Sequence, residues 1–248
     1  MFKNKVFGFF LFLGFYANAQ TIDPIEIDRP DQTECPAIVP KGMFQMENGF
    51  NFENVDADST TLLLPSSLLK VGIYNNFELR LIAEFTIQET LTEKIIGLKP
   101  IYLGFKIKIC EEKGWLPKTS LIAHILLPKF ASEDLKTSYA APKFRFTMQH
   151  TITEKIGFSY NLGTEWSGET AEKAFIYTLT SSYKINKKWG SYLEIYGFIP
   201  DNQNPDHRYD GGFTYLLNNN VIFDISGGFG ITANAPRNYI SLGFSFRV

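Results

Sequence analysis

After its first 20 residues, the sequence contains no run approaching 18 consecutive apolar residues, which excludes membrane-spanning helices. It also lacks a basic block or a basic helix, which argues against a nucleic-acid partner. Histidine is scarce, and His124, His150 and His207 are too scattered to suggest a metal site. We therefore expect neither a metal nor another cofactor.

Residues 1–19 have the pattern of a secretory signal peptide. Lys3 and Lys5 give a charged start, the next 11 residues are an apolar run, and Ala17-Asn18-Ala19 is a small-x-small cleavage site. A run of 11 residues is too short to anchor the chain across a bilayer. With Lys3 and Lys5 removed, 22 basic side chains remain against 26 acidic ones. The exported chain is then periplasmic, secreted or an outer-membrane barrel.

Cysteine occurs only at Cys35 and Cys110. Neither lies beside the cleavage site, so a lipid-anchored protein is not expected. In an oxidising compartment the two thiols can pair, and the predicted strands place both near one rim of the fold. The sequence leaves a disulfide and two free thiols as alternatives.

The last ten residues, Tyr239 to Val248, alternate between large apolar side chains and small or polar ones. This period of two predicts a strand with one apolar face and excludes a helix. Ser241, Gly243, Phe246 and Val248 match the C-terminal signal that the outer-membrane assembly machinery reads on a closing barrel strand. The alternative is the last strand of a soluble sandwich. An aromatic content of 15% with only 20% charged residues favours a barrel that faces lipid.

Similar alternations from residue 42 onward predict twelve strands in one domain, residues 42–248. Short and long connections alternate between the strands. The short turns are centred on residues 74–76, 111–114, 153–154, 186–188 and 218–220, and the longer loops on 53–60, 87–98, 129–138, 167–173, 200–208 and 232–238. Short periplasmic turns, longer external loops and an even strand number are typical of outer-membrane barrels. The predicted fold is an all-β, antiparallel transmembrane β-barrel in the outer membrane, in contact with its lipid.

The polar parity of the strands predicts charged walls around a lumen. Basic residues fall on one side: Lys106, Lys108, Lys143 and Arg145. Most acids fall on the other: Glu47, Glu194, Asp210 and Asp224, with Glu78, Arg80 and Glu84 between the two groups. Two interpretations remain: a transverse field across a narrow aqueous path, or a salt-bridged lumen that keeps the barrel closed.

Residues 20–41 contain prolines and acids without a hydrophobic period, which predicts an extended segment. This segment carries Asp28, Arg29, Pro30, Asp31 and Thr33, and it either folds into the lumen, where Arg29 can pair with the acidic wall, or tethers the barrel on the periplasmic side.

The motif around these residues resembles the opening of a family of outer-membrane transporter-like proteins associated with the meta pathway of phenol degradation, in its Bacteroidetes-type members. The matching positions are Asp28 to Asp31, Thr33, Pro36, Val39 to Gly42, Gln45, Glu47 and Gly49. Cys35 stands where the family usually has a small residue. The resemblance covers residues 28–248 and implies a passive channel for small compounds, hydrophobic or aromatic ones among them, without identifying the solute.

Enzymatic activity is not expected. Some twelve-stranded outer-membrane barrels are phospholipases, but none of the three histidines has a serine two residues away on a lipid-facing strand. The alternative to a channel is a closed barrel with a structural or surface-interaction role. The external loops are short, which disfavours a loop-based receptor.

Overall fold

The computed structural model describes residues 23–248, so the expected signal peptide at residues 1–19 lies outside the described residues. Within them, no helix is both long and apolar enough to cross a membrane.

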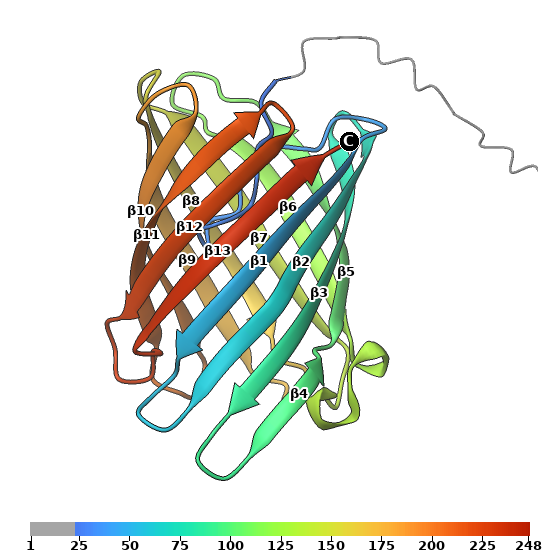
Figure 1. The fold of residues 1–248 in the computed structure, drawn as a ribbon. Coiled ribbons are helices and arrows are strands. Elements are labelled where there is room, and N and C mark those ends of the chain that lie inside the picture. Colours follow the sequence, from blue (N-terminus) through green and yellow to red (C-terminus); the bar gives the residue numbers. More distant parts are fainter. Residues whose placement is uncertain (1–22) are drawn as a thin grey trace, which may run out of the picture.

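Thirteen strands form one antiparallel sheet, and the pairing of β2 with β3 closes it into a barrel (Figure 1). Twelve strands make the wall: β1 Phe44–Asn54, β2 Thr60–Tyr74, β3 Phe77–Glu89, β5 Ile101–Cys110, β6 Lys118–Leu127, β7 Ala141–Thr151, β8 Ile156–Trp166, β9 Lys173–Lys184, β10 Trp189–Pro200, β11 Asp206–Asn218, β12 Val221–Gly230 and β13 Asn238–Arg247. Closure leaves the wall without a free edge, as a lipid environment requires. The expected twelve-stranded barrel is confirmed.

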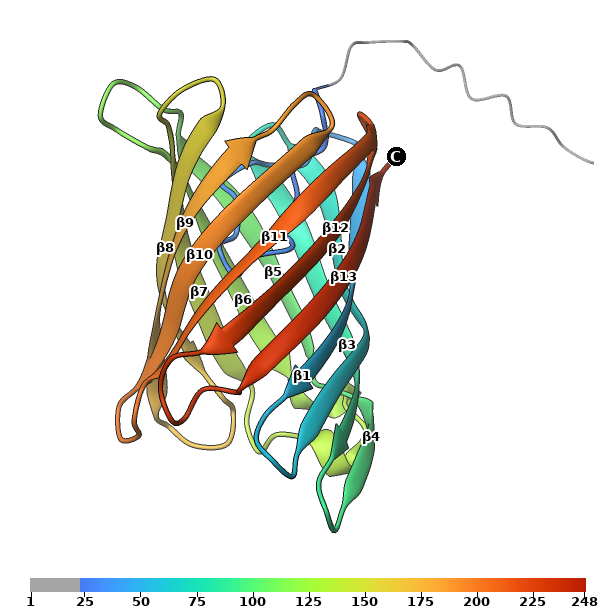
Figure 2. The ribbon, with the colours of Figure 1, turned by 60° about the vertical axis from the view of Figure 1, so that its left-hand side comes forward.

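The thirteenth strand, β4 Lys94–Leu98, corrects the prediction of a loop at residues 87–98. It pairs only with the end of β3, and the hairpin extends beyond the barrel rim in both ribbon views (Figures 1 and 2). A run of five residues is too short for the alternation of apolar and polar side chains to predict a strand. Ser132 in the β6–β7 loop holds this hairpin, because its Oγ accepts a hydrogen bond from the Leu98 amide at 2.9 Å. That loop also contains two short 3₁₀ helices, Pro128–Phe130 and Glu133–Leu135.

The two ends of the barrel differ as the connections predicted. The C-terminus and the start of β1 lie at the end with the short turns, and the longer loops occupy the other end (Figure 1). We call these the short-turn end and the long-loop end. His207 was expected in a loop at the long-loop end, but it is the second residue of β11. The register of β2 shifts between Leu63 and Ser66, which marks a bulge near Pro65.

Side chains alternate across the wall so that the polar ones point inward. On β13, Ile240 and Leu242 are about half exposed on the outer surface, whereas Ser241 and Ser245 are buried. Around the barrel the largest fully buried side chains include Arg80, Lys70 and Lys106. This is the reverse of a water-soluble core, and it suits an outer surface that contacts lipid. Glycine at position 243 leaves room on the inner face, because a Cβ there would overlap the carboxylate of Asp224.

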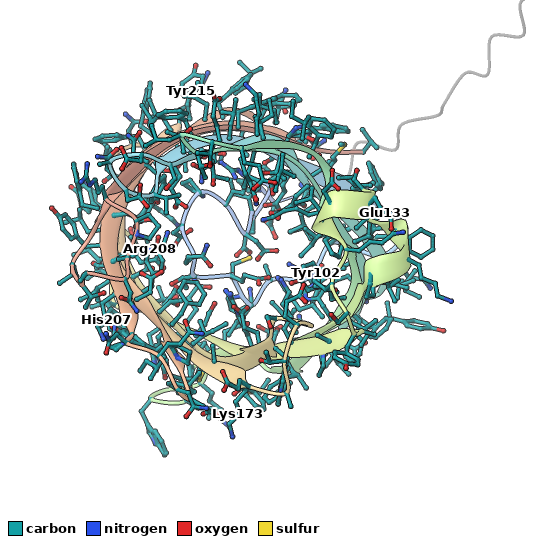
Figure 3. The ribbon with its side chains drawn as sticks, turned by 90° about the horizontal axis from the view of Figure 1, so that it is seen from below. Tyr102, Glu133, Lys173, His207, Arg208 and Tyr215 are labelled. Carbon is teal, nitrogen blue, oxygen red and sulfur yellow. The ribbon has the colours of Figure 1, made fainter. Side chains whose placement is uncertain are left out.

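Residues 23–41 form no strand and run through the barrel interior. Viewed from the long-loop end, this segment crosses the lumen, with Arg208 and Tyr102 inside the ring of strands and Tyr215 outside it (Figure 3). We call residues 23–41 the lumen segment. Its side chains and amides meet both charged walls, which places the candidate functional site inside the barrel.

The barrel lumen as the candidate functional site

One wall of the lumen presents three buried cations from neighbouring strands. Lys70 on β2, Arg80 on β3 and Lys106 on β5 are each at most 1% exposed. All three converge on the carboxylate of Asp28 in the lumen segment, at 3.0 Å from Lys70 Nζ, 2.9 Å from Arg80 Nη1 and 2.9 Å from Lys106 Nζ. We call Lys70, Arg80 and Lys106 the cationic wall.

Burial by itself would raise the pKa of Asp28, but the charges of Lys106, Lys70 and Arg80 outweigh it and hold that pKa well below its usual range. Asp28 is therefore ionised and is the common partner of the cationic wall. Buried cations are tolerated only where carboxylates and hydrogen bonds satisfy them.

Two further carboxylates, Glu47 and Glu78, complete this balance. Glu47 Oε1 lies 2.5 Å from Lys70 Nζ, and Glu78 Oε1 lies 3.0 Å from Arg80 Nη1. Glu47 was expected on the opposite, acidic side, and this expectation is wrong. The reason is that β1 and β2 are adjacent in the ring, so a carboxylate on β1 faces a lysine on β2. Lys70 was absent from the expected lumen residues, because the bulge near Pro65 disturbs the parity of β2.

The other expected basic residues occupy different places. Arg145 on β7 donates to the Gln32 carbonyl oxygen at 3.1 Å, and Lys143 lies over the ring of Tyr102 at 4.0 Å. Lys108 lies at the short-turn end, paired with Glu111 at 2.6 Å, so it is not part of the cationic wall.

Glu84, expected between the two walls, lies toward the long-loop end. It pairs with Lys99 at 3.0 Å and accepts a hydrogen bond from Ser66.

The opposite side of the lumen carries Glu194 on β10, Asp210 on β11 and Asp224 on β12, which we call the acidic wall. Glu194 accepts hydrogen bonds from the amides of Gln32 and Thr33, at 2.7 and 2.8 Å. Arg29 Nη2 lies 3.0 Å from Asp224 Oδ1 and donates to Ser241 Oγ at 2.9 Å. The Tyr239 hydroxyl donates to Asp210.

The lumen segment thus matches both walls in charge. Asp28 and Glu34 meet cations, since Glu34 Oε2 lies 2.5 Å from Arg80 Nη2, while Arg29 meets the acidic wall. Nearer the strand β1, the Val39 amide donates to Glu78 at 2.7 Å. The segment is therefore bound at several points along its length.

The lack of a side chain at Gly49 leaves room for the Arg29 guanidinium. A Cβ built at Gly49 would overlap the Nη1 and Cζ atoms of Arg29. The close approach of a charged side chain to the β1 backbone explains a glycine within this strand. Sequence reasoning noted Gly49 only as part of the motif.

Two of the cavities that border the lumen segment lie toward opposite ends of the barrel. The outer cavity, of about 280 Å³, opens among long-loop residues and is bounded on one side by the tyrosines 196 and 239 and by Pro30 of the segment. The inner cavity, of about 190 Å³, lies among polar residues of β7, β8 and β9 and is bounded by Thr33 and Cys35. A solute crossing the barrel would have to pass from one cavity to the other beside the segment.

The cysteines and histidines, all of which lie within residues 23–248, do not form a reactive group. Cys35 and Cys110 are both free thiols. His124 lies within the lumen, where its Nε2 accepts a hydrogen bond from Arg80 Nε at 3.3 Å. The Tyr177 hydroxyl lies 2.9 Å from His207 Nδ1 near the long-loop end. Among residues 23–248, no group of three histidine, cysteine or acidic side chains has the geometry of a metal site.

Comparison with known proteins gives the same architecture. An outer-membrane channel from Pseudomonas putida F1 superposes with a TM-score of 0.67 at 10% identity, over 90% of this chain and 100% of that one. The KdgM porin superposes with a TM-score of 0.53 at 11% identity, over 82% and 98%, and the NanC porin with 0.52 at 13%, over 83% and 100%. These similarities establish an outer-membrane barrel fold.

No curated protein sequence matches the chain. The family model described as "Putative MetA-pathway of phenol degradation" matches residues 27–248, which include the motif at Asp28 and the entire barrel. The chain belongs to this family.

Proposed function

We propose that this protein is a passive outer-membrane channel for small compounds, aromatic ones among them, with a lumen narrowed by residues 23–41. The observation that carries the proposal is a closed barrel in which the lumen segment leaves a cavity on each side. Twelve strands give a barrel intermediate between side-chain-filled eight-stranded barrels and open porins. A narrow path beside an internal segment is consistent with that size.

The solute class is supported by the family and by the rings in the outer cavity. The family description refers to phenol degradation. Tyr196 and Tyr239 offer ring faces and edges to a solute entering from the long-loop end. The cavity is otherwise polar and charged, so a small aromatic compound with a polar group fits it better than a plain hydrocarbon does.

Planar bilayers containing the refolded mature protein test this proposal. The intact protein should give small, stable conductance steps, and phenol in the bath should reduce or modulate them. Deleting residues 21–40 should raise the single-channel conductance several-fold, because the segment occupies the lumen. Absence of any conductance from both proteins would contradict the channel function. Conductance unchanged by the deletion would contradict the role of the segment.

The second candidate is a closed barrel with a structural role. It is favoured by the buried network around Asp28, which binds the lumen segment through three cations. In this case the intact protein inserts and never conducts, while the deletion variant conducts. The same two recordings therefore separate the two functions.

The route to the membrane is part of the proposal. Residues 1–19 direct export and are removed, residues 20–41 form the N-terminal segment that contains the lumen segment, and residues 42–248 form the barrel domain in outer-membrane lipid. The assembly machinery recognises the C-terminal stretch through Ser241, Gly243 and Phe246 of β13 and through Val248 after it, and the neighbouring Ile240 and Leu242 face outward. Replacing Phe246 with aspartate should reduce the folded, heat-modifiable form in outer membranes, and normal assembly of this variant would contradict the assignment.

A further inference from the structure

The position of Asp31 between two cavity linings distinguishes it from the other residues of the lumen segment. It borders both cavities, and it is the one residue that the linings of the outer and the inner cavity share. The outer lining contains residues near the long-loop end, such as Glu53 and Lys99, whereas the inner lining contains Gln149 and Ser182 near the short-turn end. A path that joins these two cavities therefore passes Asp31.

The charges around this constriction are unbalanced. Each cation that lines the outer cavity already has an acidic partner: Arg29 with Asp224 at 3.0 Å, Lys99 with Glu84 at 3.0 Å and Arg208 with Glu53 at 2.8 Å. Asp31, in contrast, forms no ion pair within residues 23–248. Its carboxylate lies near Glu194, which binds the amides of the next two residues, Gln32 and Thr33, and it is repelled by the charges of Glu194 and Asp210.

Unused hydrogen-bonding groups surround the same point. Asp210 is 3% exposed, and within the described part of the chain its Oδ1 atom has no hydrogen-bond partner. Tyr192 is 7% exposed, its hydroxyl is likewise unpartnered there, and it lies within electrostatic range of Asp210, Asp31 and Glu194. Buried oxygen atoms normally have partners, so Asp210 Oδ1 and the Tyr192 hydroxyl add unsatisfied polar atoms near Asp31, although neither residue lines the outer or the inner cavity.

We propose that small monovalent cations cross the barrel at this constriction, bound in passage by the carboxylate of Asp31 together with Glu194 and Asp210. Carboxylates that line a narrow pore replace part of a cation's hydration shell and repel anions, as acidic rings do in cation channels. The inference deepens the proposed channel function and rests on it. It assigns to Asp31 the selection of cations, including the ammonium groups of small organic solutes.

The test measures reversal potentials of the full mature protein across a tenfold KCl gradient. The intact channel should favour potassium over chloride. Asp31→Asn keeps the size of the side chain but removes the charge, so the potassium-to-chloride permeability ratio should fall roughly threefold to tenfold. Asp210→Asn, in a residue that lines neither cavity, should lower the ratio by a smaller factor. Asp201→Asn, in an exposed turn at the long-loop end, is the matched control and should leave it unchanged.

The outcomes separate the two proposals. Loss of selectivity in Asp31→Asn with an unchanged control supports the cation path. A conducting protein whose selectivity is the same with and without the Asp31 charge overturns the path and leaves the channel function standing. An intact protein that never conducts overturns the channel function, and the cation path with it.

Discussion

The two walls of the lumen bind the same segment in different ways. The cationic wall contacts side chains, because Lys70, Arg80 and Lys106 all reach the one carboxylate of Asp28. The acidic wall mostly accepts backbone amides, since Glu194 binds the N–H groups of Gln32 and Thr33. The first arrangement neutralises its charges and fixes the segment. The second leaves part of its negative charge without a partner, beside the cavities.

This difference assigns separate tasks to the two sides. A buried cation without a counterion is costly, so the cationic wall needs Asp28 in place. Within residues 23–248, the acidic wall has a protein cation only where Arg29 reaches Asp224, and Asp31 adds another carboxylate to it. Anchoring is therefore concentrated on β2, β3 and β5, whereas the proposed selectivity depends on Asp31 of the lumen segment and on the carboxylates of β10 and β11 beside it. Three experiments can break or sharpen this contrast.

Asp28→Asn should have the largest effect. Asparagine keeps the size of the side chain but leaves three buried cations with one carboxylate fewer, and breaking a buried ion pair costs about 3–5 kcal/mol. The segment should leave the cationic wall, so conductance should approach that of the protein lacking residues 21–40, and thermal unfolding in detergent should shift to lower temperature. Asp201→Asn is again the control. Wild-type conductance in Asp28→Asn would show that the segment is held elsewhere.

Gly49→Ala should have an intermediate effect. The added methyl group overlaps the Arg29 guanidinium, and overpacking of this kind costs about 1–3 kcal/mol. Arg29 should lose its contact with Asp224, and conductance should rise less than in Asp28→Asn, because the cationic wall still holds Asp28. Gly227→Ala on β12 is the comparison variant, since a Cβ there meets only a carbonyl oxygen at 3.2 Å. Equal conductance in the two glycine variants would argue against a role of Arg29.

The alternation of residues predicted the barrel because a strand in a lipid-facing wall must present opposite chemistry to its two faces. The same parity placed Lys106, Arg145, Glu78, Glu194, Asp210 and Asp224 inside. The alternation did not predict Lys70 as a lumen residue, because the bulge near Pro65 shifts the register of β2. It also could not reveal partners across the lumen. Asp28 meets three cations because of the way in which the lumen segment folds back into the barrel. No local pattern in the sequence encodes that path.

The ion-pair partners of Lys108 and Glu47 also explain why the sequence placed these two residues wrongly. Lys108 has inward parity, but it stands two residues before the end of β5, where Glu111 of the following turn is nearer than any lumen carboxylate. Glu47 lies on β1, and only the pairing of β1 with β2 brings it to Lys70. Strand order was therefore as informative for the lumen as the side chains themselves.

The smallest expected effect is a dependence of selectivity on pH. Partial burial and the neighbouring charges of Glu194 and Asp210 hold the pKa of Asp31 well above its usual range. The groups that face it are Thr180 from β9, Glu194 and Tyr192 from β10 and Asp210 from β11. At low pH Asp31 is protonated and neutral, so potassium should be weakly preferred.

As the pH rises through this raised pKa, the carboxylate ionises and the preference for potassium should increase. The window thus lies above the pH at which an exposed aspartate titrates, and reversal potentials recorded between pH 4 and pH 9 cover it. In Asp31→Asn the rise attributable to this group should be absent, whereas Asp201→Asn should follow the intact protein. A selectivity that is flat with pH in the intact channel would mean that Asp31 keeps one charge state throughout, and the contrast between an anchoring wall and a selecting wall would then rest on Glu194 and Asp210 alone.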